Sequence, residues 1–357
     1  CKPDRPYLIL TLFHSTGASG YIGGDILSVL IAKHPEHKYR LLVRNEQSQK
    51  QILAAYPSVV IVSGGLDDIE VITEESANAD VIIHNADSAD HLAAAQAIAR
   101  GAIEGHSPDR PVYWLHTSGA GVFSHFDDEN NTYGERSEET YDDMRDIHDI
   151  TSLPDYAFHR TVEKAVLDAG AQNPDILKVA IISPTTVYGT GRGPCSRRSR
   201  QIYVMAEYIL GQNRIPVIGR GQAIGSHIHV ESLSAVYIQL FELALQGRRE
   251  GLYWGAEAYY LAEQGEHCWG EVAHSIGQIA VEKGFLPPAS KEIVLDKKSA
   301  YDLAGFEATS WGHNMRCRAT RARSILGWQP AGISLNAELP QIVEEEYQRL
   351  KVRSLSQ

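Results

Sequence analysis

Three glycines spaced three residues apart, Gly17, Gly20 and Gly23, follow an apolar run and open a segment that predicts a helix. Such a turn can hold a diphosphate, because one glycine permits the sharp turn, another lets backbone N–H groups approach the phosphates, and the third lets helix and strand pack closely. The amino end of the helix adds a dipole that attracts anions. The turn therefore predicts a dinucleotide pyrophosphate site formed by Gly17, Ser19, Gly20, Tyr21, Ile22 and Gly23. A tight strand-to-helix connection without a ligand is the alternative.

Arg44 stands at the end of the second apolar run, residues 39–43. In a dinucleotide-binding fold, an acidic residue near this point accepts hydrogen bonds from the ribose hydroxyls, whereas an arginine accommodates a 2′-phosphate. Arg44 therefore favours NADP(H) over NAD(H) as the cofactor. A surface arginine at a strand end is the alternative.

The elements that must position these residues alternate along the chain. Short apolar runs predict buried strands at residues 7–13, 39–43, 59–62, 81–83, 112–115 and 177–183, because parallel strands covered on both faces are apolar throughout. Helical segments lie between them, among them an alanine-rich one at residues 89–102 that Gly101 and Gly105 are expected to break. This alternation predicts an α/β fold with a doubly wound parallel sheet, the Rossmann arrangement, and a smaller C-terminal lobe.

Composition narrows the class of protein and its partners. Of the 357 residues, 43% are apolar and 22% are charged, and the net charge of −12 argues against nucleic acid or an anionic membrane as a partner. The four cysteines are far apart in sequence and predict a reducing compartment. Because neither a membrane-spanning apolar run nor a signal-like amino terminus is evident, a cytoplasmic protein is expected, and a leader before Cys1 stays an open alternative.

The pattern Thr-Gly-x-x-Gly-x-x-Gly, from Thr16 to Gly23, resembles the extended short-chain dehydrogenase/reductases, which include nucleotide-sugar epimerases, dehydratases and dihydroflavonol-type reductases. Similar segments cover most of the chain, down to Leu-Gly-Trp-x-Pro at residues 326–330. The resemblance implies a Rossmann domain at residues 1–189 and a substrate lobe at residues 190–357, from which about residues 225–250 return to the core.

The resemblance also implies cofactor contacts beyond the glycine turn. The segment 63–68 is similar to a family segment beside the adenine, and residues 81–87 are similar to the family's fourth strand and its exit. The segment 184–191 is similar to Arg-Pro-x-x-Val-Tyr-Gly-Pro-Gly, whose backbone lies against the nicotinamide in relatives. The residues implied are Leu66, Asp67, Asn85, Ala86, Asp87, Pro184, Thr185, Thr186 and Val187.

Hydroxyl side chains follow the fifth strand in the family, and the matching run here extends from His116 to Phe123. The position where relatives carry the hydroxyl falls on Gly119, which has no side chain. Ser118 is therefore the candidate for binding the substrate oxygen, with Thr117 beside it. The alternative is that these hydroxyls bond their own backbone, as they often do in turns.

Family members carry Tyr-x-x-x-Lys on the next helix, and this chain has Tyr156 and Arg160. Residues four apart share one face of a helix, and a helix that begins near Asp155 is expected to present both side chains to the cofactor. In the family, the lysine holds the nicotinamide ribose and lowers the pKa of the tyrosine, so that the phenol exchanges a proton. Arginine keeps the charge but has a planar, forked donor group, so the exchange is not equivalent. Tyr156 is the predicted proton donor or acceptor. His159 and Lys164 are nearby polar alternatives, and a surface position is favoured for each of them.

Three other polar segments have more than one interpretation. Residues 192–200 contain four arginines, which predict either contacts to an anionic or carbonyl-rich substrate or a solvated loop. Acidic residues crowd the segment 126–155, which predicts a solvated loop. His227 and His229 share one face of an expected strand, but no third ligand accompanies them, so no metal site is predicted.

The leading hypothesis is an NADP(H)-dependent oxidoreductase that acts on a small carbonyl or alcohol metabolite. Tyr156 would exchange the proton and Arg160 would orient the ribose. Ser118 or Thr117 would bind the substrate oxygen. The departures at Gly119 and Arg160 leave two alternatives: a redox-neutral isomerase, cyclase or dehydratase that retains its nucleotide, and an NmrA-like NADP-binding regulator without turnover. A small-molecule substrate is the expected partner, and a homodimer is left open.

Overall fold

The computed structural model describes residues 12–288 and 290–355. Residues 7–11 of the first expected strand lie outside the described residues. Within the described part of the chain, no helix combines the length and apolar character needed to cross a membrane.

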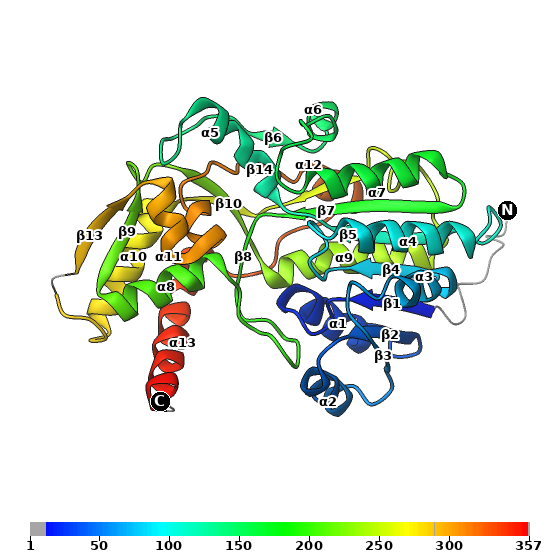
Figure 1. Cartoon of the computed structure of the whole chain (residues 1–357), viewed down its shortest axis with the longest axis horizontal. Coiled ribbons are helices and arrows are strands. Elements are labelled where there is room, and N and C mark those ends of the chain that lie inside the picture. The colour runs from blue at the N-terminus through cyan, green and yellow to red at the C-terminus, as the bar shows by residue number, and fades with distance from the viewer. Residues whose placement is uncertain (1–11, 289, 356–357) are drawn as a thin grey trace.

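Seven parallel strands form the main sheet in the order β3-β2-β1-β4-β5-β7-β11 (Figure 1). Their bounds are β1 Leu12–Thr16, β2 Lys38–Val43, β3 Val60–Ser63, β4 Val81–His84, β5 Val112–Thr117, β7 Leu177–Pro184 and β11 Tyr259–Ala262. Every residue of β4 and β5 is buried, as the continuous apolar runs predict for strands covered on both faces. The strand order reverses between β1 and β4, which is where open parallel sheets bind their ligands. The predicted doubly wound parallel sheet is confirmed.

Helices cover both faces of this sheet. One face packs against α3, α4 and α7 through a core that includes Ile82 and Trp114, and the other packs against α1 and α9 through a core that includes Ile83 and Leu115. The bounds are α1 Tyr21–Lys33, α2 Glu46–Ala55, α3 Ile69–Asn78, α4 Leu92–Glu104, α7 Arg160–Gln172, α9 Val230–Leu245 and α12 Thr320–Leu326.

The prediction that Gly101 breaks the alanine-rich helix is wrong, because α4 continues through it to Glu104. A Cβ atom at position 101 would lie 2.1 Å from the carbonyl oxygen of Thr73 in α3. The glycine therefore serves close packing of two neighbouring helices rather than a helix end.

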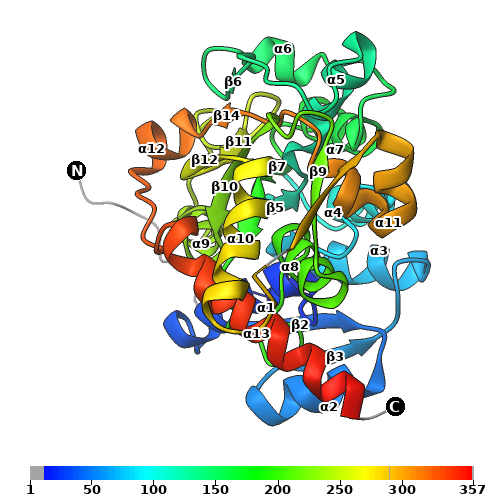
Figure 2. The ribbon, with the colours of Figure 1, turned by 90° about the vertical axis from the view of Figure 1, so that its left-hand side faces the viewer.

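A smaller lobe lies beside the sheet, at the left of Figure 1, with α13 projecting from it. A three-stranded sheet, β12-β10-β8, and a two-stranded one, β13-β9, form its strands. In Figure 2 α10 and α13 lie side by side, and α8 packs against both. The bounds are β8 Thr186–Tyr188, α8 Gln201–Gln212, β9 Arg214–Ile218, β10 Ile224–His229, β12 Gly265–Cys268, α10 Trp269–Glu282, β13 Lys291–Leu295, α11 Lys297–Ser310 and α13 Leu335–Leu355.

The chain passes between the sheet and the lobe several times. After β8 and β10 have joined the lobe, α9 packs against α1 on the sheet. Later, β11 adds to the edge of the sheet beside β7, and α12 packs on β11. Residues after 190 therefore contribute to both parts.

The acidic segment 126–155 is not simply a solvated loop. A short 3₁₀ helix, η1 Ala120–Ser124, precedes it, and the segment contains α5 His125–Asn130, β6 Tyr141–Asp142 and α6 Ile147–Thr151. Strand β6 pairs with β14 Cys317–Arg318. Asp143 is fully buried and accepts hydrogen bonds from the backbone N–H groups of Leu261 (2.9 Å) and Arg321 (2.7 Å). Burial raises the pKa of Asp143 to about 7. These contacts fix the segment to the edge of the main sheet.

Candidate active site

The glycine turn lies between β1 and α1, at the carboxyl end of the sheet. Gly17 has φ +82°, and its carbonyl accepts a hydrogen bond from the Gly20 N–H at 2.8 Å. A Cβ atom at position 23 would lie 2.4 Å from the Gly17 carbonyl oxygen, so only glycine fits there. No side chain caps the first turn of α1, which leaves its N–H groups directed at the cleft. This cradle fits the diphosphate of a dinucleotide.

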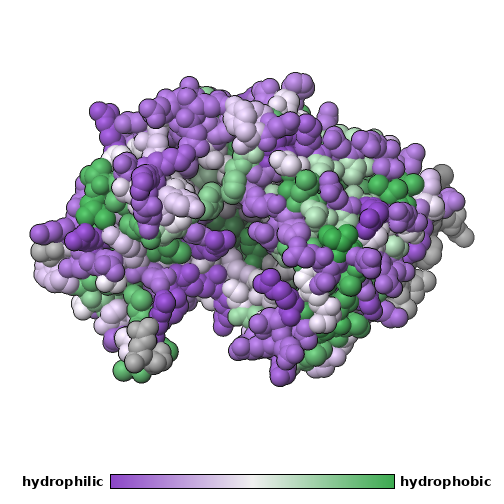
Figure 3. Space-filling model, in the orientation of Figure 1, coloured by the Kyte–Doolittle hydropathy of each residue, from purple (hydrophilic) through white to green (hydrophobic). Residues whose placement is uncertain are grey.

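A cleft of about 560 Å³ runs from this turn towards the lobe, and Figure 3 shows the hollow between the two halves of this face. The predicted residues that line it are Gly20, Tyr21, Ile22, Gly23, Asn85, Ser118, Pro184, Thr185, Thr186 and Val187. The predicted residues outside its lining are Gly17, Ser19, Arg44, Leu66, Asp67, Ala86, Asp87, Thr117, Tyr156 and Arg160. The structure thus brings the phosphate turn and the expected nicotinamide segment to one cavity.

The expected nicotinamide segment continues directly from β7. Thr185 donates its hydroxyl to the Ala262 carbonyl at 3.0 Å, and its backbone N–H reaches the same oxygen at 3.2 Å. Thr186 then begins β8, which pairs with β10 of the lobe. The segment is therefore held from both sides, and its backbone forms a rigid wall of the cleft.

Asn85 follows β4 and lines the cleft, and only one of its two side-chain polar atoms has a hydrogen-bond partner in the described part of the chain. Its Nδ2 donates to the Thr117 hydroxyl at 2.5 Å, and Thr117 also bonds the Tyr237 hydroxyl at 2.6 Å. Asn85 Oδ1 is buried and has no hydrogen-bond partner within residues 12–288 and 290–355. An unsatisfied amide oxygen at this point suits a donor group of a ligand, such as a ribose hydroxyl. The Thr117 hydroxyl, by contrast, is engaged inside the protein.

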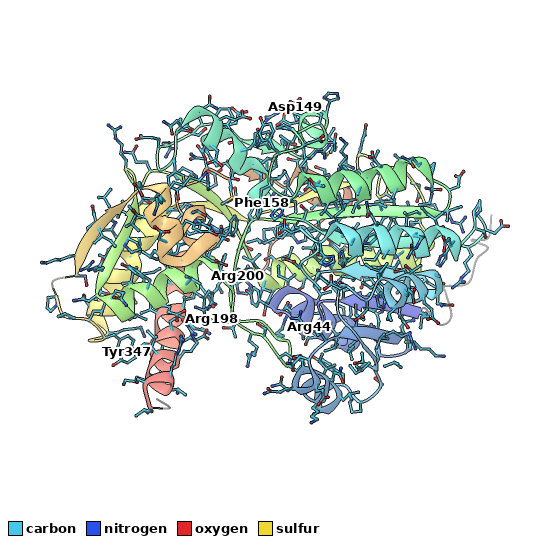
Figure 4. All side chains as sticks on the ribbon, viewed as in Figure 1. Arg44, Asp149, Phe158, Arg198, Arg200 and Tyr347 are labelled. Carbon is cyan, nitrogen blue, oxygen red and sulfur yellow. The ribbon has the colours of Figure 1, made fainter. Side chains whose placement is uncertain are left out.

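Arg44 lies exposed at the carboxyl end of β2, in the sheet part of Figure 4. Its side chain passes beside Gly65, where a Cβ atom would be 3.5 Å from Arg44 Cδ. The structure, over its described residues, gives the Arg44 guanidinium neither an ion pair nor a hydrogen bond. Asp67 is almost fully exposed and bonds His91 at 3.2 Å. An exposed, unpaired guanidinium can bind a phosphate group.

Tyr156 and Arg160 do not share a helix face. The prediction of a helix from Asp155 is wrong, because α7 begins only at Arg160. Tyr156 lies in the preceding turn with 71% of its surface exposed, and its hydroxyl contacts Glu129. The Arg160 side chain is buried and donates to the carbonyls of Leu153, at 3.1 Å, and Thr151. These hydrogen bonds close the turn and hold Arg160 inside the protein, and neither Tyr156 nor Arg160 lines the cleft.

His159 and Phe158 enter the cleft instead. The side chain of His159 is only 11% exposed, and its Nδ1 lies 2.7 Å from Asp90 Oδ1. The sequence interpretation named His159 as an alternative to Tyr156 but favoured a surface position for it. The one signal that could have drawn attention to His159 is Gly119, because a glycine at this position leaves room for a ring from another segment.

Ser118 lines the cleft, but its hydroxyl proton is directed into the protein. Ser118 Oγ donates to Glu163 Oε1 at 2.5 Å, and the Tyr259 hydroxyl donates to the same oxygen at 2.5 Å. Glu163 is fully buried, and burial raises its pKa. Ser118 can therefore accept a hydrogen bond from a ligand, while its own donor is held by a buried carboxyl group.

The sheet beneath the cleft carries buried histidines from neighbouring strands. His84 Nδ1 lies 2.6 Å from the Thr16 hydroxyl, and the rings of His84 and His116 are 5.4 Å apart between centroids. Burial lowers the pKa of His116 to about 3 and the pKa of His84 well below its usual value. Both rings are neutral near pH 7, so these two histidines add no charge to the site.

The four arginines of residues 192–200 all have partners. Arg192 pairs with buried Asp25 at 2.6 Å, and Arg198 with Glu346 at 2.6 Å. Arg200, labelled with Phe158 in Figure 4 where the sheet part meets the lobe, pairs with Glu307. Arg197 donates to the Gly191 carbonyl at 2.7 Å. These contacts fasten the loop to α1 and to the lobe.

The two histidines weighed as metal ligands bond other groups of the protein. His227 Nδ1 lies 3.2 Å from His267 Nδ1, and His229 Nδ1 accepts from the Glu231 N–H at 3.2 Å. Over the residues that the structure describes, one group of three side chains has ligand atoms close enough for a metal ion. It consists of His34, Glu36 and His37, at the end of α1 remote from the glycine turn.

Comparison with known proteins places the chain in a family. Residues 16–253 match the family model described as NAD dependent epimerase/dehydratase family, and the chain belongs to this family. A relative from Acremonium sp, "Oxidase ucsJ", is 33% identical over 342 residues, which cover 94% of this chain and 97% of that protein. The resemblance to extended short-chain dehydrogenase/reductases is confirmed.

Solved structures show the same fold. The PbgP3 protein from Burkholderia pseudomallei superposes with a TM-score of 0.67 at 14% identity, covering 96% of this chain and 98% of its own. DesIV, a dTDP-glucose 4,6-dehydratase from Streptomyces venezuelae with NAD and TYD bound, superposes with a TM-score of 0.63 at 18% identity, covering 95% and 97%. The family supports an enzyme that uses a nicotinamide nucleotide.

Proposed function

We propose that this protein is an NADP(H)-dependent oxidoreductase that acts on a small carbonyl or alcohol metabolite. Membership of the NAD-dependent epimerase/dehydratase family supports the nucleotide, and the relative named as an oxidase supports redox chemistry. The observation that carries the cofactor preference is the unpaired Arg44 guanidinium at the carboxyl end of β2, beside Gly65. An arginine at this point favours a 2′-phosphate on the adenosine ribose.

In this proposal, each part of the site has one task. The N–H groups of the first turn of α1 bind the diphosphate, and Arg44 binds the 2′-phosphate. The backbone of residues 184–187 supports the nicotinamide, which when bound supplies or accepts a hydride. The substrate carbon lies in the cleft next to Ser118, and the segment from Ser199 to Gln201 closes the site from the lobe side.

Nucleotide binding tests this proposal without knowledge of the substrate. Calorimetric titration with NADPH and with NADH is expected to show binding of both, with NADPH bound at least about tenfold more tightly, since a charge-assisted contact contributes about 1.5–3 kcal/mol. A panel of aldehydes, ketones and quinones is then presented with NADPH, and oxidation is followed by the loss of nicotinamide absorbance. Absence of binding to either nucleotide contradicts the proposal.

A nucleotide-binding regulator without turnover is the second candidate. The observation in its favour is the exposed position of Tyr156, outside the lining of the cleft. A regulator would bind NADPH, but no compound of the panel would oxidise the bound NADPH. The two candidates therefore share the binding result and differ in turnover.

A further inference from the structure

A histidine and an aspartate from separate segments meet at the edge of the cleft. Both His159, just before α7, and Asp90, just before α4, line it, and His159 Nδ1 lies 2.7 Å from Asp90 Oδ1. A carboxylate can only accept, so the Nδ1–H donates to Asp90, and this contact fixes the ring and its tautomer. No hydrogen bond occupies Nε2 in the described part of the chain. The nitrogen that remains available is the one that points away from Asp90.

The imidazole fills space that a glycine leaves open. A Cβ atom at position 119 would lie 3.3 Å from His159 Nε2, and one at position 121 would lie 3.3 Å from the same atom. Position 119 is where relatives are expected to carry a hydroxyl side chain. The ring of His159 thus lies next to the space that a side chain at position 119 would occupy.

The backbone is bent to present this ring. His159 has φ +68° and ψ −17°, a left-handed conformation that is unfavourable for a residue with a side chain. Such conformations cost about 1–3 kcal/mol and gather at functional sites. The next residue, Arg160, starts α7 and turns its side chain into the protein, so the bend separates an inward-directed arginine from a cleft-directed histidine.

Aromatic rings cover the histidine from the lobe side. Phe158 packs on His159 with ring centroids 3.8 Å apart, and Phe306 of α11 packs on Phe158 at 4.9 Å. This cover joins the sheet part to the lobe directly above the imidazole.

We propose that His159, oriented by Asp90, is the proton donor and acceptor of this enzyme, in the place that Tyr156 was expected to take. The proposal rests on the proposed oxidoreductase function. In reduction, the carbonyl carbon of the substrate gains a hydride from the dihydronicotinamide, and the C=O electron pair moves to oxygen. That oxygen takes the proton from Nε2–H of the imidazolium, which becomes neutral imidazole and later recovers a proton from water. In oxidation, neutral Nε2 accepts the alcohol proton as the hydride leaves.

Chemical labelling tests the position of His159 independently of turnover. Diethyl pyrocarbonate acylates accessible imidazole nitrogens, and mass spectrometry of peptides identifies which histidines react. His159 is expected to react in the nucleotide-free protein and to be protected by saturating NADPH, while buried His84 and His116 stay unlabelled in both states. An unreactive His159, or one that NADPH does not protect, would overturn the proposal.

Three variants then test its role. H159Q is expected to lower kcat by about 100-fold or more, the usual contribution of a positioned acid–base group, with NADPH affinity within about twofold of the wild type. D90N should lower kcat by less, because it disturbs only the orientation of the ring. H148Q is the matched control, since His148 is 91% exposed and pairs with Asp149 outside the cleft, and it should change neither kcat nor binding.

The outcomes separate this proposal from the one on which it rests. If the wild type binds no nicotinamide nucleotide, the proposed function fails. If it binds NADPH and turns over, but H159Q keeps wild-type kcat while Y156F loses it, the function stands and the role of His159 is overturned. Thermal unfolding curves of H159Q and H159N distinguish loss of a proton donor from loss of folding, since asparagine tolerates the left-handed backbone of position 159.

Discussion

The two ends of the cleft are built in different ways. At the phosphate end, the groups that would contact a ligand are backbone N–H groups, held by the turn from Gly17 to Gly23. At the other end, the available groups are the side chains of His159, Asp90 and Ser118, which come from three segments. A site made of backbone follows from glycine spacing alone, whereas a site made of side chains depends on where each helix begins.

The largest effect is expected from Gly23→Ala, which attacks the backbone end. The added Cβ would lie 2.4 Å from the Gly17 carbonyl oxygen and 2.8 Å from its carbonyl carbon, and neither atom can move without opening the turn. We expect NADPH affinity to fall by about 100-fold, which corresponds to about 3 kcal/mol. Calorimetric titration measures it.

Gly211→Ala is the matched control for Gly23→Ala. Gly211 lies in α8 and has nothing within 4 Å of an added Cβ, so alanine should stabilise the helix by about 0.5–1 kcal/mol and leave binding unchanged. If Gly23→Ala also binds NADPH like the wild type, the phosphate end is not the backbone site described above.

The second largest effect is expected from Arg44→Asp, which tests the side chain assigned to the 2′-phosphate. Removing the cation and adding a carboxylate should weaken NADPH binding by about tenfold or more, while NADH binding changes little. Arg220→Asp makes the same charge change on an exposed arginine of the lobe, which pairs with Glu135 at 3.4 Å, and should have no effect. An unaltered preference for NADPH would remove Arg44 from the site.

The fold was predictable because most residues of its central strands are apolar and helices lie between successive strands of the sheet. The phosphate turn was predictable because the spacing of its glycines determines the backbone conformation directly. The start of α7 was not, because the buried side chain of Arg160 reaches back to the carbonyls of Leu153 and Thr151, and these tertiary contacts close the preceding turn. The sequence places Tyr156 and Arg160 four residues apart, but only a continuous helix would make that spacing meaningful.

The position of His159 could not be read from helical spacing either. It depends on a left-handed backbone at a residue that is not glycine, and on space left by Gly119, which is distant in sequence. Gly119 is visible as a departure from the family pattern, but its consequence appears only when the segments before α4, after β5 and before α7 are brought together. The acidic segment 126–155 shows the same limit, because burial of Asp143 depends on β11 and α12.

The smallest effect is expected from Glu163→Gln, which tests whether the Glu163 carboxyl group, which accepts a hydrogen bond from Ser118, is neutral or charged in the folded protein. Glu163 Oε1 accepts from Ser118 and Tyr259, and within the described residues Oε2 has no hydrogen-bond partner. Glutamine keeps an acceptor at Oε1 and has nearly the same volume, so we expect the free energy of unfolding to change by within about 1 kcal/mol at neutral pH.

The pKa shift of Glu163 predicts how the effect of E163Q on the free energy of unfolding changes with pH. Burial raises the pKa of folded Glu163 above its ordinary value of 4.5, so its stabilising contribution is complete below that value and is lost as pH rises through the folded pKa. E163Q cannot ionise, so its stability relative to the wild type should increase from about pH 5 to pH 8 in urea unfolding experiments. Glu257→Gln, at an exposed site, should give parallel curves for the two proteins. Parallel curves for E163Q would mean that Glu163 is charged in the folded protein, and the donor of Ser118 would then be permanently held away from the cleft.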